Sequence, residues 1–277
     1  MGRQAGRASV RHVAGAACAI LFRVSALFER RPAAGTAEVE PAAVAAGAAW
    51  RRELLRRIRI RPVAKGLATT LGISAFFIAY FWVLHHPFSV PTFMPLTALD
   101  RIIAFEPGAL PVYFSLWLYV GIAPALLDSG RALAAYGLAT LAISVVGLAI
   151  FMAWPTAVPP AAIDWSLHPS IEFLKGVDLA ANACPSLHVA FAVFTGLCLH
   201  RLLRDMHSRH WLLALNWAWC IGILYSTLAT RQHVVLDVLA GAVLGAVVAA
   251  VLGVSMRPAA AVERAASAAQ AASSRRG

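Results

Sequence analysis

The chain of 277 residues is 60 % hydrophobic and only 13 % charged. This balance excludes an ordinary soluble domain and is typical of a protein whose solvent is largely hydrocarbon. The formal net charge of +11 requires no nucleic-acid partner, because basic residues near membrane spans set topology and attract anionic lipids. We therefore expect an integral membrane protein that contacts membrane lipids and no nucleic acid.

A basic region, residues 1–62, precedes the first apolar stretch that is long enough to cross a bilayer. Residues 13–28 are apolar but interrupted by Arg23, which disfavours a signal peptide. Residues 32–49 are rich in Ala, Pro and Gly and predict a linker. In residues 50–62, WRRELLRRIRIRP, arginines surround a few aliphatic residues, a pattern typical of a helix on an anionic surface. The region is predicted to be partly disordered and partly amphipathic.

Six apolar stretches follow, each about as long as the ~20 residues that span a bilayer core. They cover residues 66–84, 110–127, 132–153, 185–203, 211–229 and 233–254. This pattern predicts an all-α integral membrane fold, a six-transmembrane-helix bundle over residues 63–255. Residues 256–277 are rich in Ala, Ser and Arg and are expected to form a disordered tail.

The basic residues predict how the bundle is oriented. Of the 24 Lys and Arg residues, 21 lie on the segments that share a side with the termini. Only Arg101, Lys175 and Arg231 lie on the other side. Because positive residues favour the cytoplasmic side, we expect both termini in the cytoplasm. The long loops at 85–109 and 154–184 then face outward, as in a bacterial inner (cell) membrane.

Glycines and cysteines carry weaker signals. Gly241 and Gly245 form a GxxxG pattern in the last span, which predicts a helix-packing face. The four cysteines have neither paired spacing nor a nearby histidine cluster, so neither a disulfide framework nor a zinc site is expected. We expect no metal and no cofactor, and therefore activity that survives a chelator.

The first chemically informative motif is Pro185-Ser186-Leu187-His188, at the outer end of the fourth span. Proline suits a first helical turn. There, backbone N–H groups without partners point along the positive end of the helix dipole and favour an anion. Phosphate is the expected guest, bound near Ser186 and Leu187, with a further donor in the Ser186 hydroxyl.

The second motif places His233 four residues before Asp237, at the outer start of the sixth span. On a helix, residues four apart share one face, so the carboxylate is expected to accept the imidazole N–H. That contact fixes the tautomer and makes the other ring nitrogen more basic. Ionisable residues inside a membrane are costly and usually functional. His233 is therefore the candidate nucleophile, with His188 as proton donor to the leaving alcohol and later base for the incoming hydroxyl.

These residues resemble the type 2 phosphatidic acid phosphatase superfamily, which shares a six-helix bundle with vanadium haloperoxidases. The family pattern consists of K-x6-R-P, then P-S-G-H, then S-R-x5-H-x3-D. The third part is matched in spacing by Ser226-Thr227, five residues, His233, three residues and Asp237. The resemblance implies a lipid phosphoesterase that acts on a phospholipid or lipid phosphate through a phosphohistidine, with its active site on the outer face.

The sequence departs from this pattern in three places. Leu187 replaces the glycine, Thr227 replaces the arginine, and no K-x6-R-P precedes the fourth span. With these departures, the motifs resemble those of the inositol phosphorylceramide synthase branch. This resemblance implies transfer of a phosphoalcohol to an acceptor such as ceramide or diacylglycerol. Arg231 is the best substitute for the missing cations. Lys175 and Arg101 are weaker candidates.

Several readings remain open at this point. Water and a lipid hydroxyl can both resolve a phosphohistidine, so hydrolysis and transfer are alternatives. A non-catalytic membrane protein such as a transporter would carry polar groups near mid-membrane or on broken helices, whereas these residues gather at one surface. Vanadate-dependent halide oxidation would need more cations than the outer loops supply. The loop residues His168, Asp164 and Asp178 are expected to be spectators. The residues do not specify an oligomeric state.

Overall fold

The computed structural model of the protein describes residues 40–177 and 182–252. The apolar run at 13–28 and the predicted tail at 256–277 lie outside the described residues.

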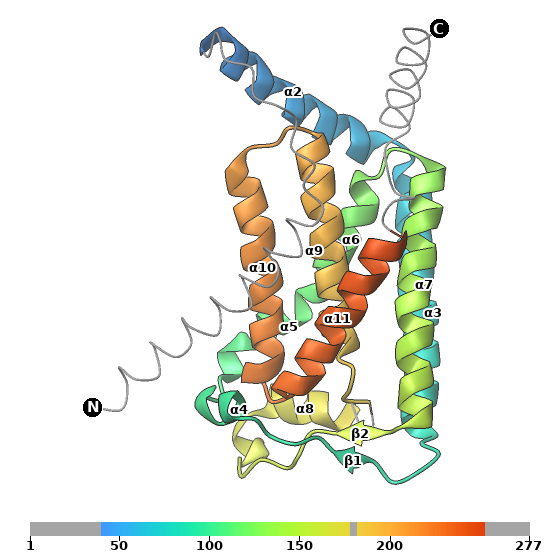
Figure 1. The fold of residues 1–277 in the computed structure, drawn as a ribbon, viewed down its shortest axis with the longest axis vertical. Coiled ribbons are helices and arrows are strands. Elements are labelled where there is room, and N and C mark those ends of the chain that lie inside the picture. The colour runs from blue at the N-terminus through green and yellow to red at the C-terminus, as the bar shows by residue number, and fades with distance from the viewer. Residues whose placement is uncertain (1–39, 178–181, 253–277) are drawn as a thin grey trace, which may run out of the picture.

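Six helical segments within the described residues are long and apolar enough to cross a membrane. They are α3 (Pro62–His85), the segment Pro107–Leu126, α7 (Gly130–Ala153), α9 (Leu187–Asp205), α10 (His210–Ala229) and α11 (Val235–Leu252). Their long axes run roughly along the length of the molecule (Figure 1). The predicted all-α six-span fold is confirmed, and each span ends within a few residues of its predicted limits.

The second span differs from the prediction because it is not one helix. It consists of η1 (Pro107–Ala109), α5 (Leu110–Phe114) and α6 (Leu116–Leu126). Between α5 and α6, the Ser115 hydroxyl donates a hydrogen bond to the carbonyl of Val112, a local bond that tends to bend helices. Trp219 of α10 donates to the same hydroxyl and so helps to hold the bend in place.

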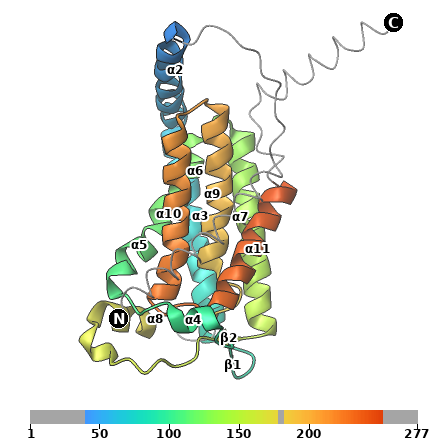
Figure 2. The ribbon, with the colours of Figure 1, turned by 60° about the vertical axis from the view of Figure 1, so that its left-hand side comes forward.

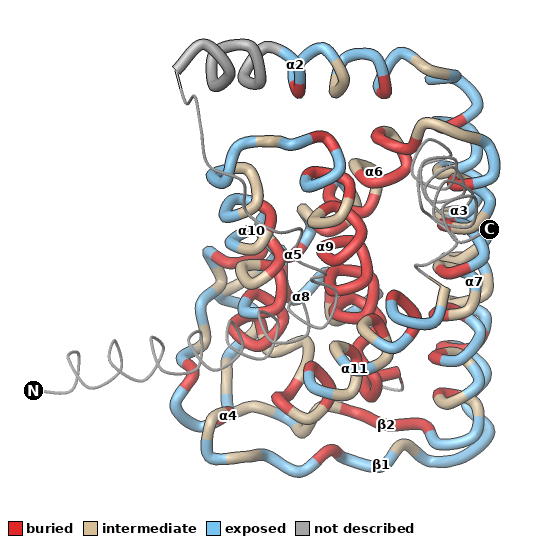
Figure 3. The backbone as a smooth tube through the Cα atoms, turned by 45° about the horizontal axis from the view of Figure 1, so that its top comes forward, coloured by how far each residue is buried: buried red, intermediate tan, exposed pale blue. Residues whose placement is uncertain are grey.

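Helix α9 forms the centre of the bundle. Its residues are buried almost without interruption from Leu187 to Leu199, and it packs against α6, α7, α10 and α11. Figure 3 shows this as a nearly continuous buried stripe along α9. The first turn of α9 is therefore fixed by neighbours on several sides.

The GxxxG pattern lies where α11 crosses α9. A Cβ atom at Gly241 would collide with the carbonyl oxygen of Ser186, and one at Gly245 would collide with that of Ala190. Glycine removes the side chain that would otherwise separate the two backbones. The predicted packing face is confirmed, and its partner is α9.

One end of the bundle, here called the loop end, carries the long connecting segments. It holds the parallel strands β1 (Thr92–Phe93) and β2 (Thr156–Ala157), with α4 (Ala98–Ile102), η2 (Trp165–Leu167) and α8 (Pro169–Val177). Helices α9 and α11 both begin at this end (Figures 1 and 2). The loop end therefore contains the start of both histidine motifs.

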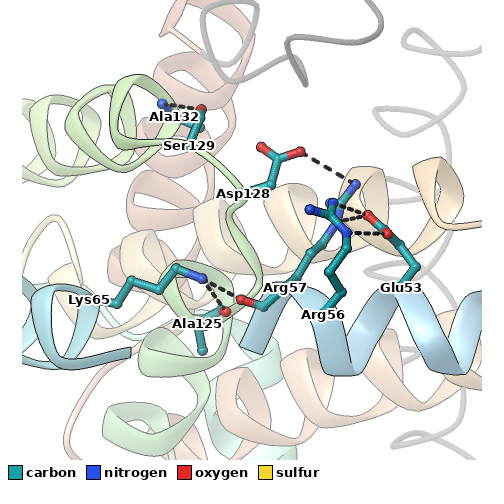
Figure 4. Close-up of polar contacts among 8 residues, drawn as sticks. All are labelled: Glu53, Arg56, Arg57, Lys65, Ala125, Asp128, Ser129 and Ala132. Carbon is teal, nitrogen blue, oxygen red and sulfur yellow. Dashed lines mark hydrogen bonds and ion pairs between the residues drawn. The ribbon is translucent and has the colours of Figure 1, made fainter. Parts of the chain in front are cut away.

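At the opposite end, α2 (Glu40–Arg59) crosses beyond the tips of the spans (Figure 1). Lys65 Nζ donates to the carbonyls of Arg57 and Ala125, at 2.7 and 2.9 Å. The buried Arg57 side chain reaches Asp128 at 3.9 Å and donates to Glu53 at 2.7 Å, as Figure 4 shows. These contacts anchor α2 to the turn between α6 and α7.

The anchor of α2 should loosen in acid. Hydrogen bonding by Arg56 lowers the pKa of Glu53 from 4.5 to about 2. The contribution of the Glu53 carboxylate to the stability of this anchor is therefore complete above about pH 4.5. It is lost as the pH falls towards 2, because the protonated carboxyl no longer pairs with the arginines. Amide exchange of residues 50–59, corrected for intrinsic rates, should rise between pH 5 and pH 3. In Glu53→Gln the exchange should be fast already at pH 5. A wild-type rate that does not change with pH would contradict this prediction.

Candidate active site

The first turns of α9 and α11 are joined directly. The backbone N–H of Ser186 donates to the carbonyl of Asp237 at 3.0 Å. Both residues are fully buried. The two predicted motifs, about 50 residues apart in the sequence, therefore meet at the loop end of the bundle.

His233 and Asp237 form the centre of the second motif. Nδ1 of His233 lies 3.6 Å from Oδ2 of Asp237, an ion-pair distance that is longer than a hydrogen bond. Nδ1 and the other carboxylate oxygen have no hydrogen-bond partner among the described residues. Because Nδ1 faces the carboxylate, Nε2 is the ring nitrogen left for chemistry. In apo sites such catalytic contacts are often long and shorten when substrate binds.

The prediction that His233 and Asp237 share one helical face is wrong in one respect. Helix α11 begins at Val235, so His233 lies in the preceding turn. The reason is local: Oδ2 of Asp237 accepts the backbone N–H of Val234 at 3.0 Å and so closes that turn onto the helix. The carboxylate closes the turn and faces the imidazole that the turn carries.

His188 is buried in the first turn of α9. Its Nε2 lies 3.0 Å from the carbonyl oxygen of Tyr113, and its ring stacks on the Tyr113 ring at 4.0 Å between centroids. A carbonyl only accepts hydrogen bonds, so the hydrogen is on Nε2, and Nδ1 is the nitrogen that can take up or release a proton. Tyr113 acts here through its backbone and ring stacking, which no motif in the sequence indicated.

A cavity of about 830 Å³ opens beside His233. Its lining includes Arg101, Lys175 and Arg231, the three basic residues predicted to face outward. Phe93, Phe105 and Trp165 also line it, whereas His188 does not. The three cations predicted to face outward therefore share one cavity with the candidate nucleophile.

Backbone carbonyls hold two of these cations in place. Arg231 adopts a left-handed backbone conformation with φ of 58°. Its guanidinium donates to the carbonyls of Asp100 and Ile103 at 2.9 and 2.8 Å. Lys175 donates to the carbonyl of Arg231 at 3.1 Å and lies 4.6 Å from the Trp165 ring centroid. The positive charge at the cavity wall is thus positioned before any substrate arrives.

The residues predicted to bind phosphate in the first motif have other contacts in this structure. Ser186 caps α9, with Oγ accepting the N–H of Val189 at 3.3 Å. Leu187 packs against Gly147 of α7. Thr227, at the position of the family's arginine, is buried, and its hydroxyl donates to the carbonyl of Leu224. The phosphate-binding roles of Ser186 and Leu187 stay predictions.

Cys184 lies next to the site but is poorly suited to nucleophilic chemistry. Burial, together with the nearby negative charge of Asp237, raises the pKa of its thiol to about 11. The thiolate is the reactive form. Cys184 is therefore a structural neighbour of Asp237, and its backbone N–H is fixed by the hydroxyl of Thr156 at 2.8 Å.

His168 and Asp164, two polar residues of the outer loop, are not part of the cavity lining. His168 packs against the Phe105 ring, and the Asp164 carboxylate accepts two hydrogen bonds from Ser166. Asp178 lies outside the described residues. The spectator role of these residues stays a prediction.

Comparison with known proteins gives one match. No curated protein and no solved structure matches the chain. Residues 129–259 match the family model described as the PAP2 superfamily. The matched range includes α7, α9, α10, α11 and both histidine motifs. This match supports the resemblance to the type 2 phosphatidic acid phosphatase superfamily.

Proposed function

We propose that this protein is a membrane enzyme that hydrolyses or transfers the phospho-group of a lipid through a phosphohistidine at His233. The match to the PAP2 superfamily supports a membrane lipid enzyme of the phosphatase or phosphotransferase type. One structural observation supports the choice of His233 as the nucleophile. His233 lines a cavity with three basic residues, while its Nδ1 faces the buried carboxylate of Asp237.

In the first step, Nε2 of His233 attacks phosphorus and forms an N–P bond as the bond from phosphorus to the leaving oxygen breaks. His188, protonated at Nδ1, gives that proton to the departing alcohol. The carboxylate of Asp237 stabilises the positive charge that develops on the His233 ring. The products of this step are the free alcohol, neutral His188 and the phosphohistidine.

In the second step, an incoming hydroxyl resolves the intermediate. Its oxygen attacks phosphorus while its proton passes to Nδ1 of His188, and the N–P bond breaks to restore His233. Water as the acceptor gives hydrolysis. A lipid hydroxyl gives a new phospholipid.

The cations account for binding of the negatively charged group. Arg101, Lys175 and Arg231 line the cavity, so their charge is already in place where negative charge increases during the reaction. The excess of basic residues on the segments that share a side with the termini supports a location of this cavity on the outer face of a bacterial inner membrane.

Transfer of a phosphoalcohol is the finer form of the proposal. It is supported by Leu187 and Thr227, which resemble the inositol phosphorylceramide synthase branch. It is also supported by the cavity volume of about 830 Å³, which leaves room for a head group larger than phosphate. The acceptor would be a lipid hydroxyl such as that of diacylglycerol or ceramide.

Product analysis tests the proposal. Purified protein in lipid nanodiscs should convert labelled phosphatidate or a labelled phosphoinositide, with a chelator present. Free phosphate or phosphoalcohol reports hydrolysis. A labelled lipid that forms only when diacylglycerol or ceramide is added reports transfer. Absence of both products with both donors, or strict dependence on a divalent ion, would overturn the proposed chemistry.

A further inference from the structure

A segment outside both histidine motifs holds the turn that carries His233. Residues 100–106 are joined to residues 229–235 by four hydrogen bonds. The backbone N–H of Glu106 donates to the carbonyl of Ala229 at 2.9 Å. The guanidinium of Arg231 donates to the carbonyls of Asp100 and Ile103 at 2.9 and 2.8 Å. The backbone N–H of Val235 donates to Oδ1 of Asp100 at 2.8 Å. The turn is therefore fixed from outside the motif as well as by Asp237.

Asp100 makes two of these four contacts. It is buried, with 4 % of its surface exposed, although it belongs to a short helix in a loop. Its Oδ1 accepts the N–H of Val235, the first residue of α11. Its Oδ2 accepts the backbone N–H and the hydroxyl of Thr97, both at 2.7 Å. One carboxylate thus links the N-terminus of α11 to the N-terminus of α4.

Two physical effects favour this arrangement. A carboxylate at a helix N-terminus satisfies a backbone N–H that has no partner inside the helix, and it interacts favourably with the helix dipole. A buried N–H that loses its acceptor is costly, so removal of this carboxylate favours movement of the turn. His233 lies two residues before Val235, with Arg231 two residues before that, so both would move with it.

We infer that Asp100 is a positioning residue for His233 and Arg231, a role that rests on the proposed function. Its carboxylate fixes the start of α11 and its carbonyl holds the guanidinium of Arg231. Asp100 contacts no reacting atom in this scheme. A misplacement of about 1 Å at a reacting group can lower a rate about 100-fold, which sets the scale of the expected effect.

A matched control separates positioning from simple loop stability. Thr97 contacts the other oxygen of the same carboxylate and caps α4, and among the described residues it makes no hydrogen bond to α11. Thr97→Val therefore weakens the loop and leaves the bond from Val235 to Asp100 in place. Asp100→Asn keeps an oxygen that can accept from Val235 while removing the charge.

The test measures kcat, thermal unfolding and amide exchange of residues 231–236 for three variants. Asp100→Ala should lower kcat roughly 10- to 100-fold and speed exchange in that segment. Asp100→Asn should restore kcat to within about 3-fold of the wild type, because most of the effect is assigned to the acceptor. Thr97→Val should lower the unfolding temperature and leave both kcat and that exchange near wild type.

The outcomes distinguish this inference from the function on which it rests. Wild-type kcat in Asp100→Ala, together with an inactive His233→Ala, would overturn the positioning role and leave the proposed function intact. An equal loss of kcat in Thr97→Val and Asp100→Ala would also overturn it. If Asp100→Ala does not fold, Asp100→Glu moves the carboxylate instead and must show the same loss. Full activity of His233→Ala would overturn the proposed function itself.

Discussion

Replacing His233 by alanine should abolish turnover of every lipid phosphoester that the protein accepts, with kcat falling at least about 10⁴-fold. The reason is that the reaction path needs a nitrogen nucleophile beside the cavity, and Nε2 of His233 is the candidate placed there. The neighbouring thiol of Cys184 cannot substitute, since its raised pKa of about 11 keeps it protonated. The loss should therefore be in kcat for hydrolysis and for transfer alike.

The measurement should include the intermediate as well as the product. Rapid quenching with a radiolabelled lipid phosphate should leave acid-labile label on the wild-type protein and none on His233→Ala. In His188→Ala both release and acceptor attack should slow, most severely for poor leaving groups. His210→Ala is the control, because His210 is exposed at the start of α10, at the end of the bundle opposite the site. Unchanged turnover in His233→Ala would refute the nucleophile assignment.

The spans were predictable because each depends on a local property of the chain. A run of apolar residues long enough to cross a bilayer needs no information about its neighbours. The third span, for example, was expected at 132–153 and is observed as Gly130–Ala153. The packing role of Gly241 and Gly245 was predictable for the same reason, although the sequence did not identify α9 as their partner.

The start of α11 was not predictable in the same way. The spacing of His233 and Asp237 suggested one helical face, but side chains set where this helix begins. Asp237 accepts the N–H of Val234, and Asp100 accepts that of Val235 across 135 residues of sequence. A contact over that separation leaves no periodic signal in the chain. In the sequence, nothing distinguishes Asp100 from an ordinary loop carboxylate.

The candidate site, too, was predictable from the sequence only in part. Motif spacing and the charge bias predicted that both histidines lie at one end, and the structure brings their helices into contact there. The bond from His188 to Tyr113 uses a backbone carbonyl, a group that every residue carries, so no residue type could indicate it. The charge bias predicted that Arg101, Lys175 and Arg231 face outward. Their gathering in one cavity depends on how the loops pack.

Replacing Gly245 by alanine should destabilise the bundle and disable the site together. The added Cβ would meet the carbonyl of Ala190, so α11 must move away from α9. Overpacking of this kind typically costs about 1–3 kcal/mol, and here the obstacle is backbone, which cannot change rotamer. The displacement would also pull Asp237 from Ser186, whose backbone bond joins the two motifs. We expect a lower unfolding temperature in detergent and a kcat reduced at least about 10-fold.

Two other helical glycines provide matched controls. A Cβ at Gly72 of α3 or at Gly137 of α7 meets no atom within 4 Å. Alanine at either position should therefore leave stability within about 1 kcal/mol of the wild type, the scale of the difference in helix propensity. If Gly245→Ala proved as stable and as active as Gly137→Ala, the close contact of α11 with α9 would not be what holds the two histidine motifs together.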